Sequence, residues 1–320
     1  MASRSGTRST RRPPVRRRPG GSPVAPARRA TAGDWIGGAR LRTLPLAIAP
    51  VALGTGSAYA QRVPAHWWLA LICLAVALLL QIGVNFANDY SDGVRGSDRF
   101  RVGPARLTAS GAAKPRTVLA VALACFALAA VAGLVIVVVT QFWWLLAIGA
   151  VAIAAAWFYT GGRRPYGYAG LGEIAVFVFF GLVATCGTTF VLLGELDSEA
   201  LLCGVAIGCI ACAALVVNNL RDLEHDAKAG KRTLSVRIGA TGSRVLYGVL
   251  MLVPFLLLLF LCLFYTTPSL VFLAVLLAAP AVLITSTAKT AKELVLALSL
   301  TGLTGLVYGL GLGLALALPA

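Results

Sequence analysis

Apolar segments long enough to cross a lipid bilayer recur along this chain, and they restrict the folds that it can adopt. A transmembrane helix needs about 20 predominantly apolar residues, and within hydrocarbon only helices and closed barrels satisfy their own backbone hydrogen bonds. Nine such segments can be marked, at residues 44–60, 66–88, 118–139, 141–160, 171–194, 200–220, 245–265, 268–286 and 294–317. The sequence therefore predicts an all-α, polytopic membrane protein with nine transmembrane helices. Its mean hydropathy of +0.84 agrees with that class.

The positions of lysine and arginine support this helix count and set the orientation. Cytoplasmic loops of membrane proteins carry an excess of both residues. With a cytoplasmic N-terminus, the inside segments are the N-terminal tail and residues 89–117, 161–170, 221–244 and 287–293, and they hold 27 of the 28 basic residues. Only Arg62 falls outside, so we expect an external C-terminus. The net charge of +16 is then a topology signal, and we predict no nucleic-acid partner.

The N-terminal segment differs in composition from the rest of the chain. Its first 42 residues contain eleven arginines, a single acidic residue and many Pro, Gly, Ser and Thr residues. Such a segment buries too little apolar surface to offset the entropy lost on ordering. We therefore expect residues 1–34 to form a disordered, arginine-rich cytoplasmic tail that touches anionic lipid. Residues 35–320 are expected to form one transmembrane domain.

Two groups of carboxylates lie on the side that this topology makes cytoplasmic. An asparagine and two aspartates spaced i, i+4 and i+7 end the second apolar segment, and a similar set spaced i, i+4 and i+8 ends the sixth. Helical geometry places the members of each set on one face. Their oxygen atoms are hard ligands of the kind that Mg²⁺ prefers. The residues are Asn85, Asp89, Asp92, Asn218, Asp222 and Asp226.

Basic residues accompany both carboxylate groups. The candidates for binding an oxyanion are Arg95, Arg106, Lys114, Lys231 and Arg232. Carboxylates that hold a metal ion, together with cations that hold an oxyanion, describe a diphosphate site. The alternative is that these residues form ordinary ion pairs at solvated loop ends. Two sets on the same side of one bundle favour the site over that alternative.

Several stretches resemble a known family. "NDYSDGVRGSD" (88–98) with "RLTASG" (106–111), and "NNLRDLEHDAKAGKRTL" (218–234), resemble the two aspartate motifs of the UbiA superfamily of membrane prenyltransferases. "RLRTLPLAIAPVALG" (40–54) and "YTGGRRPYGYAGLGEIAVFVFFG" (159–181) look like one branch, the 1,4-dihydroxy-2-naphthoate polyprenyltransferases of menaquinone synthesis. The resemblance implies nine helices around a central cavity capped by cytoplasmic loops. It also implies Mg²⁺ bound by Asp89, Asp92, Asp222 and Asp226, with Asn85 and Asn219 as weaker candidates.

The same resemblance implies a reaction. A polyprenyl group would pass from a polyprenyl diphosphate to 1,4-dihydroxy-2-naphthoate, with loss of CO₂ and diphosphate, to give demethylmenaquinol. The expected location is the bacterial cytoplasmic membrane. The candidates for binding the acceptor are Tyr159, Arg163, Arg164 and Glu173.

Three other functions predict sequence features that differ from those of this chain. A related prenyltransferase using 4-hydroxybenzoate, haem or a phosphoribosyl acceptor would keep both aspartate motifs but should lack the "PYGYAGLGE" stretch (165–173) that this chain has. A CDP-alcohol phosphotransferase would carry its aspartates in one stretch, whereas here they lie in two distant ones. An ion-coupled transporter would place carboxylates near the middle of its helices, and apart from Glu173, near a helix start, none lies within a predicted span.

Overall fold

The computed structural model describes residues 29–61, 64, 66–97 and 106–318, and within these ranges the regular structure is entirely helical. Most of the predicted tail, residues 1–28, lies outside the described residues, but α1 begins inside its last part. In α1 a capping box between Thr31 and Asp34 satisfies the first backbone amides. The helices are α1 (Ala32–Gly38), η1 (Leu41–Thr43), α2 (Pro45–Gln61), α3 (Leu69–Arg95), α4 (Pro115–Thr140), α5 (Leu145–Phe158), η2 (Tyr166–Ala169), α6 (Gly172–Val176), η3 (Phe177–Val183), α7 (Ala184–Leu193), α8 (Ser198–Lys228), α9 (Leu234–Leu261), η4 (Thr267–Ala274), α10 (Val275–Thr287) and α11 (Ala291–Ala317).

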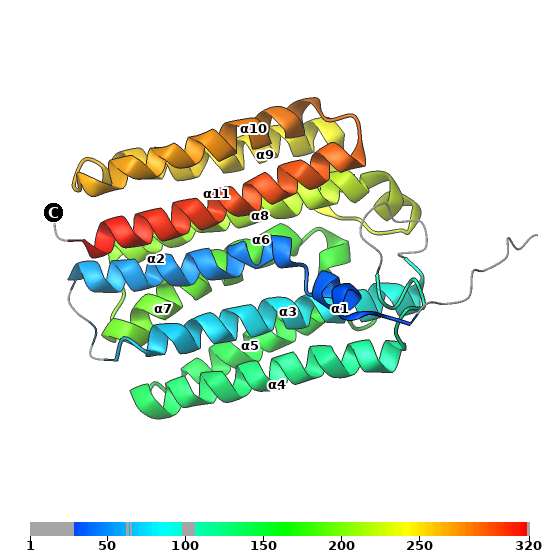
Figure 1. The fold of residues 1–320 in the computed structure, drawn as a ribbon, viewed down its shortest axis with the longest axis horizontal. Coiled ribbons are helices and arrows are strands. Elements are labelled where there is room, and N and C mark those ends of the chain that lie inside the picture. The colour runs from blue at the N-terminus through cyan, green and yellow to red at the C-terminus, as the bar shows by residue number, and fades with distance from the viewer. Residues whose placement is uncertain (1–28, 62–63, 65, 98–105, 319–320) are drawn as a thin grey trace, which may run out of the picture.

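Each of the nine apolar segments coincides with helix in the structure, and the long helices run roughly along one common direction (Figure 1). The fifth segment is built from α6, the π-helical turn η3 and α7, and the eighth from η4 and α10. The largest departures from the predicted bounds are at the helix ends that the sequence predicts to be cytoplasmic. There α3, α8 and α9 continue as helix through polar residues that the apolar criterion left out.

The lengths of the helices bear on the number of membrane crossings. Among the described residues, seven helices are long and apolar enough to span a membrane, and an eighth span results if the bent pair Ala32–Thr43 and Pro45–Gln61 counts as one. The remaining segment, α5, has 14 residues and is about 21 Å long, which is shorter than the hydrocarbon core of about 30 Å. The all-α membrane architecture is confirmed, and nine crossings stay a prediction.

The core of the bundle is built around α8. Of its apolar window, 78% is buried inside the protein, against 28% for α3, α4 and α9, whose remaining apolar surface is left for lipid. Helix α8 packs against α9, α11, η3 and α2. Small residues make this close packing possible, since the side facing the neighbours is rich in alanine and cysteine.

Glycine allows α2 and α11 to approach each other at backbone distance. A Cβ atom added to Gly56 would lie 2.1 Å from the carbonyl oxygen of Gly313, and one added to Gly309 would lie 2.5 Å from the Cβ of Ala49. Gly309 and Gly313 are four residues apart and share a face of α11, which is the small-xxx-small arrangement of membrane helix pairs. This contact holds the C-terminal helix against the first long helix of the chain.

The polar ends of the helices gather at one end of the bundle. The end of α3, the loop at 106–114, α1 and the connection from α8 to α9 all lie there, whereas the C-terminal end of α11 lies at the opposite end (Figure 1). The two aspartate motifs, which are far apart in sequence, are therefore neighbours in space, as the predicted topology requires.

Candidate active site

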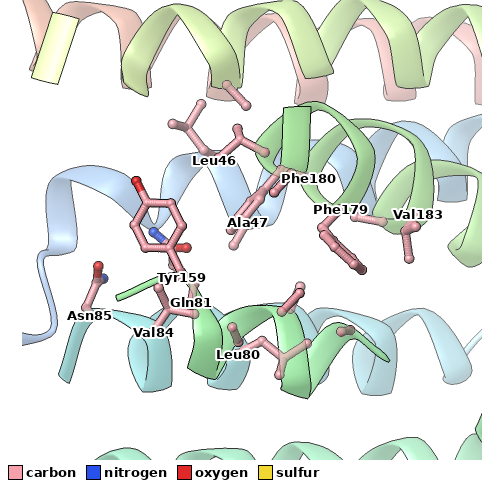
Figure 2. A pocket seen from close by; sticks show the side chains of 18 of the residues that line it. Leu46, Ala47, Leu80, Gln81, Val84, Asn85, Tyr159, Phe179, Phe180 and Val183 are labelled. Atoms are coloured by element: carbon pink, nitrogen blue, oxygen red, sulfur yellow. The ribbon is translucent and has the colours of Figure 1, made fainter. Parts of the chain in front are cut away.

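A cavity of about 600 Å³ opens between the helices at this polar end and extends toward the middle of the bundle. Its deeper part is apolar: Leu46, Leu80, Phe179 and Phe180 point into it from α2, α3 and η3 (Figure 2). The π-helical turn of η3 places its two phenylalanines on this wall; such turns are frequent at functional sites. The polar end of the cavity is lined by Asn85, Asn88, Asp92, Arg106, Asn219, Asp222, Asp226 and Lys231.

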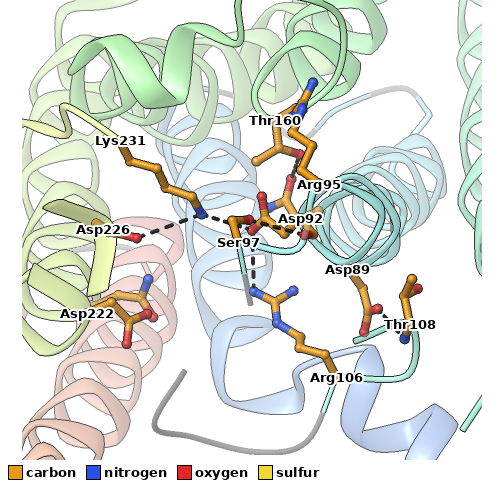
Figure 3. A network of polar contacts seen from close by, with 12 residues as sticks. Asp89, Asp92, Arg95, Ser97, Arg106, Thr108, Thr160, Asp222, Asp226 and Lys231 are labelled. Atoms are coloured by element: carbon orange, nitrogen blue, oxygen red, sulfur yellow. Dashed lines mark hydrogen bonds and ion pairs between the residues drawn. The ribbon is translucent and has the colours of Figure 1, made fainter. Parts of the chain in front are cut away.

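Lys231 links the two aspartate motifs across the mouth of the cavity. Its Nζ atom lies 3.3 Å from Oδ2 of Asp92 on α3 and 3.8 Å from Oδ1 of Asp226 on α8 (Figure 3). The Nη2 atom of Arg106 lies 3.9 Å from the same Asp92 oxygen. All four side chains are largely buried, and buried charges are tolerated when they are paired in this way. Two carboxylates thus flank one cation at the site.

The ends of both helices turn sharply, and glycine makes these turns possible. Gly230 follows α8 with φ of +75°, in the left-handed region that side chains disfavour. The turn lets the backbone N–H of Lys231 donate to the carbonyl oxygen of Asp226 at 2.8 Å, which directs the lysine back over the cavity. Gly96, with φ of +73°, ends α3 after Asp92 in the same way.

Tyr168, in the 3₁₀ turn η2, connects several groups of the site. Its hydroxyl donates to Oδ1 of Asp92, and its ring lies under the Lys231 ammonium, 4.6 Å from Nζ to the ring centroid. Arg95 lies against the same ring at 5.5 Å. Burial, with the Asp92 carboxylate as a second cause, raises the pKa of the Tyr168 hydroxyl above its ordinary value. The hydroxyl therefore remains a hydrogen-bond donor at neutral pH.

Two asparagines that line the cavity are oriented by neighbours. The Thr160 hydroxyl donates to Oδ1 of Asn88 at 2.6 Å. The Nδ2 atom of Asn219 donates to Oε1 of Glu173 at 3.0 Å. Glu173 is itself buried. It contacts Asn219 but does not line the cavity. Asn219 is a weaker candidate for metal binding. Because its amide nitrogen is bonded to Glu173, only its side-chain oxygen could serve as a ligand.

Asp222 lines the cavity beside its sequence neighbour Arg221. The Arg221 guanidinium makes two hydrogen bonds to the Asp222 carboxylate, Nε to Oδ1 at 2.8 Å and Nη2 to Oδ2 at 2.6 Å. The same guanidinium also donates to Oδ1 of Asn218 at 2.9 Å. This bidentate pair fixes the orientation of the carboxylate.

Asp89 has contacts unlike those of the other aspartates. It is 1% exposed and does not line the cavity. Its Oδ2 accepts a hydrogen bond from the backbone N–H of Leu107 at 2.9 Å, and its Oδ1 accepts one from that of Thr108 at 2.8 Å. Asn85 does line the cavity, but its Nδ2 atom donates to the carbonyl oxygen of Ala39 at 2.9 Å.

The structure does not bring every predicted residue to the cavity. Five basic residues have exposed side chains and do not line it: Arg95, Lys114, Arg163, Arg164 and Arg232. Arg95 instead donates to the carbonyl oxygens of Thr160 and Gly162 and so fastens α3 to the loop after α5. Tyr159 does line the cavity.

Sequence reasoning missed several polar residues that line the cavity, among them Arg40, Asn88, Thr160 and Tyr168. Asn88 could have been found, because it precedes Asp92 by four residues and so shares its helix face. The other three lie in the "RLRTLPLAIAPVALG" and "YTGGRRPYGYAGLGE" stretches, which pointed to the family without indicating which of their side chains face the site.

The donor set fits a divalent cation that is shared with a substrate. Among the described residues, no three carboxylate, cysteine or histidine side chains converge closely enough to hold a metal ion alone. Asp92 and Asp226 nevertheless flank one ammonium group. Mg²⁺ is usually bound by one or two carboxylates, several waters and substrate phosphates. Asp92, Asp222 and Asp226 could hold such an ion once a diphosphate supplied the remaining oxygens.

A cavity that is apolar within the bundle and carboxylate-rimmed at its polar end defines a helical membrane protein built for a ligand with a hydrocarbon tail and an anionic head. The chain belongs to the UbiA prenyltransferase family, whose family model matches residues 47–295. The resemblance drawn from the aspartate motifs is therefore confirmed.

Comparisons with individual proteins agree with this assignment. The 1,4-dihydroxy-2-naphthoate octaprenyltransferase of Mycobacterium tuberculosis is 50% identical over 292 residues, which cover 90% of this chain and 98% of that protein. The protein of the same name from Escherichia coli is 38% identical over 231 residues, covering 68% and 72%. Among solved structures, a UbiA homolog from Archaeoglobus fulgidus bound to GPP and Mg²⁺ has a TM-score of 0.64 at 15% identity, covering 89% of this chain and 99% of that one. This last likeness shows the shared fold.

Proposed function

We propose that this protein transfers a polyprenyl group from a polyprenyl diphosphate to 1,4-dihydroxy-2-naphthoate, releasing diphosphate and CO₂ and forming demethylmenaquinol. The observation that carries the proposal is the meeting of Asp92 and Asp226 around Lys231 at the mouth of an apolar cavity. The relatives named for this activity, at 50% and 38% identity, support the choice of acceptor.

The diphosphate would lie at the polar end of the cavity. Mg²⁺, when bound by Asp92, Asp222 and Asp226, would neutralise the negative charge that develops on the leaving group. Lys231 and Arg106 already point toward Asp92 and would bind the remaining phosphate oxygens, with Arg106 suited to bidentate contacts. These cations would bind the diphosphate in the intact substrate as well as during departure, so they would contribute mainly to the binding of the substrate.

The hydrocarbon part of the donor would occupy the apolar part of the cavity. The allylic carbon gains positive charge as the bond breaks, and aromatic faces can stabilise a cation by about 0.5–2 kcal/mol each. Tyr159 lies near the polar end, and Phe179 and Phe180 lie deeper along the same wall (Figure 2). The lining around them excludes water, which would otherwise capture the cation.

The acceptor would bind between the donor carbon and the α6 end of the cavity, beside Tyr159 and the Asn219–Glu173 pair. Its ring carbon that bears the carboxylate would form the new C–C bond. Loss of CO₂ then returns the electron pair of the broken C–C bond to the ring and restores aromaticity, so no ring proton has to be removed. Arg163 and Arg164 are left out of this site because their side chains are exposed.

We also propose that the site faces the cytoplasm and that the protein resides in the bacterial cytoplasmic membrane. The bundle end that carries the site is also the end that carries nearly all basic residues of the connecting loops. The positive-inside rule then places that end in the cytoplasm, where water-soluble Mg²⁺ and the acceptor are available.

The test is an assay of the purified protein with a polyprenyl diphosphate and Mg²⁺, with 1,4-dihydroxy-2-naphthoate and 4-hydroxybenzoate offered separately. We expect prenylated product and one CO₂ for each diphosphate with the first acceptor, and no product with the second. Chelation of Mg²⁺ with EDTA should abolish turnover, and added Mg²⁺ should restore it. Product with 4-hydroxybenzoate alone would move the protein to another branch of its family.

Two substitutions link the assay to the site. Asp92→Asn and Asp226→Asn each remove one of the charges that flank Lys231, and we expect each to lower kcat/KM by about 100-fold or more, since electrostatic stabilisation of a leaving group contributes several kcal/mol. Glu195→Gln is the control, since this acid follows α7 at the far end of the bundle. Near-normal rates in either aspartate variant would contradict the proposed metal site.

A further inference from the structure

We propose, building on the diphosphate site described above, that Asp89 is a positioning residue for Arg106 rather than a metal ligand. The sequence predicted a metal-binding role for all four motif aspartates. The geometry instead points to Asp89 as the anchor that holds the loop containing residues 106–113 against α3, so that Arg106 reaches the mouth of the cavity.

Both oxygens of the Asp89 carboxylate are engaged with this loop. They accept the backbone N–H groups of Leu107 and Thr108, one each, at 2.9 and 2.8 Å. Hydrogen bonds to a carboxylate are stronger than those between neutral groups, and here they offset the cost of burying a side chain that is 1% exposed. A metal ion at Asp89 would compete with these bonds and would leave one buried and one partly buried amide without an acceptor.

The backbone of α3 is shaped for the same contact. Gly93 lies one turn after Asp89 and so on the same face. A Cβ atom added to Gly93 would lie 2.4 Å from Cγ2 of Thr108 and 3.2 Å from the backbone nitrogen of Ala109. Asp89 and Gly93 therefore form one docking surface for the loop, while Asn88 and Asp92, also one turn apart, line the cavity.

The loop itself is compact and held from several sides. The N–H of Ser110 donates to the carbonyl oxygen of Arg106, and that of Ala113 to Leu107. Leu107 is 1% exposed and packs in a cluster with Phe86 from α3. Fixing the two anchored amides also fixes the position of the residue that directly precedes them.

Arg106 directly precedes the two anchored amides. Its Nη2 atom lies 3.9 Å from Oδ2 of Asp92, on the cavity side of α3, whereas Asp89 and Thr108 lie on the other side (Figure 3). Asp89 thus acts on the site through the loop backbone. Removing the anchor should weaken binding of the diphosphate without weakening binding of the metal ion.

The first test compares Asp89→Asn with Asp92→Asn by two measurements that need no turnover. Asparagine fits the same space but has only one acceptor oxygen. In Asp89→Asn we expect hydrogen exchange at the amides of Leu107 and Thr108 to speed up by about tenfold or more. Binding of Mn²⁺ at a diphosphate concentration that saturates both the variant and the unmodified protein, followed by electron paramagnetic resonance, should stay within about twofold.

Asp92→Asn should give the opposite pattern, with unchanged exchange at those amides and Mn²⁺ binding weakened about tenfold or more. The proposal is overturned if Asp89→Asn weakens Mn²⁺ binding as much as Asp92→Asn does while the two amides remain protected. Unchanged Mn²⁺ binding in Asp92→Asn would contradict the proposed metal site. The hydrogen-exchange result would still test the anchoring role of Asp89.

A double-mutant cycle tests the route through Arg106. Asp89→Asn and Arg106→Gln should each raise the KM for the polyprenyl diphosphate more than they lower kcat. The double variant should be little worse than Arg106→Gln alone, because both changes remove the same contact. Fully additive effects would contradict the proposed route.

A structure of the unmodified protein with Mg²⁺ and a non-reactive diphosphate analogue decides the matter even if Asp89→Asn does not fold. We expect the Asp89 oxygens to stay within hydrogen-bond distance of the two amides. A metal ion within about 2.5 Å of either Asp89 oxygen would overturn the proposal, since Mg²⁺ binds its ligands at about 2.0–2.1 Å.

Discussion

Lys231 is the residue on which the electrostatics of the site depend most. It is the cation between Asp92 and Asp226, and it is largely buried. Lys231→Met keeps much of the side-chain volume but leaves two neighbouring carboxylates without their shared counter-ion. We expect kcat/KM to fall by at least about tenfold, equivalent to about 1.4 kcal/mol, with most of the change in the KM for the polyprenyl diphosphate.

The matched control is Lys228→Met. Lys228 lies in the last turn of α8, and its side chain is exposed, so the same chemical change should leave the steady-state parameters within about twofold. Equal losses in both variants would mean that general charge at this end of the bundle matters, and not the place of Lys231 between the two motifs.

Tyr168 contributes a hydroxyl that sequence reasoning did not predict. Tyr168→Phe keeps the ring beside Lys231 but removes the donor to Asp92. A hydrogen bond to a charged group contributes about 1.5–3 kcal/mol, so we expect kcat/KM to fall by about tenfold or more. Tyr265→Phe removes a similar tyrosine–carboxylate bond, to Glu199, far from the site and should leave the rate unchanged.

The raised pKa of Tyr168 also predicts how stability depends on pH. Because the folded protein holds the pKa above the ordinary value of 10.0, the contribution of this group to the free energy of unfolding is fully present below pH 10. It is lost as the pH rises through the folded pKa. Unfolding followed between pH 8 and 11 should therefore show a shallower loss of stability in Tyr168→Phe than in the unmodified protein. Identical slopes would contradict the assignment.

Helix geometry explains which site residues the sequence could identify. Asp89 and Asp92 are about 60° apart around α3, and Asn88 and Asp92 about 40°, so spacing alone cannot decide which of them face the cavity. The choice depends on where the loop containing Leu107 docks, and that is a tertiary contact. Lys231 follows the second motif directly and lines the cavity, whereas its neighbour Arg232 has an exposed side chain and does not.

The α2–α11 pair shows how elements of this fold depend on small residues. A Cβ at Gly56 would meet the backbone of Gly313 at 2.1 Å, and neither backbone can move without separating the helices. We expect Gly56→Ala to lower the free energy of unfolding by about 1–3 kcal/mol, as overpacking usually does. Thermal unfolding in detergent should show this as a lower midpoint.

Gly248 provides the comparison within the same bundle. It lies in α9, and a Cβ there would meet no atom within 4 Å. Gly248→Ala should therefore be neutral or stabilising by up to about 1 kcal/mol, because alanine favours helix more than glycine does. A midpoint lowered equally by both substitutions would mean that close packing is not the cause.

Apolar length predicted the elements better than it predicted their ends. The segment expected at 245–265 begins at Leu234 in the structure, since Thr233 caps α9 and Gly239 absorbs a kink within it. The segment at 171–194 was predicted as one helix, and the structure inserts the π-helical turn η3 there. The first departure comes from a cap and a glycine kink, and the second lies on the cavity wall. Hydropathy encodes neither of them.

At the level of the whole molecule, the site exists because the ends of α3 and α8 meet on one side of the membrane. The sequence supported the meeting of these helix ends only through the distribution of its basic residues. Nearly all lysines and arginines fall in the N-terminal tail or in loops that nine crossings would make cytoplasmic. The crossing that helix length alone does not establish is that of α5, which has only 14 residues. Whether it spans the bilayer decides whether the chain crosses an odd or an even number of times.

Contacts at the two ends of α5 indicate that it crosses. Just before the helix, Phe142 packs on Phe190 near the end of α7, with 4.9 Å between ring centroids. Just after it, the Thr160 hydroxyl binds Asn88 at the cavity mouth. These partners belong to opposite ends of the bundle, and the residues that flank α5 supply the length that the helix itself lacks.

Nine crossings with a cytoplasmic N-terminus would place the end of α11 outside the cell. We therefore expect alkaline phosphatase fused after Ala317 to be active, because the enzyme acquires its disulfides only in an oxidising compartment, and green fluorescent protein fused there to be dark. The same reporters inserted at Lys289, between α10 and α11, should behave in the opposite way. An inactive phosphatase after Ala317 with an active one at Lys289 would mean eight crossings, with α5 folded back on one side, and the loop bearing Thr160 could then not reach the cytoplasmic mouth of the cavity.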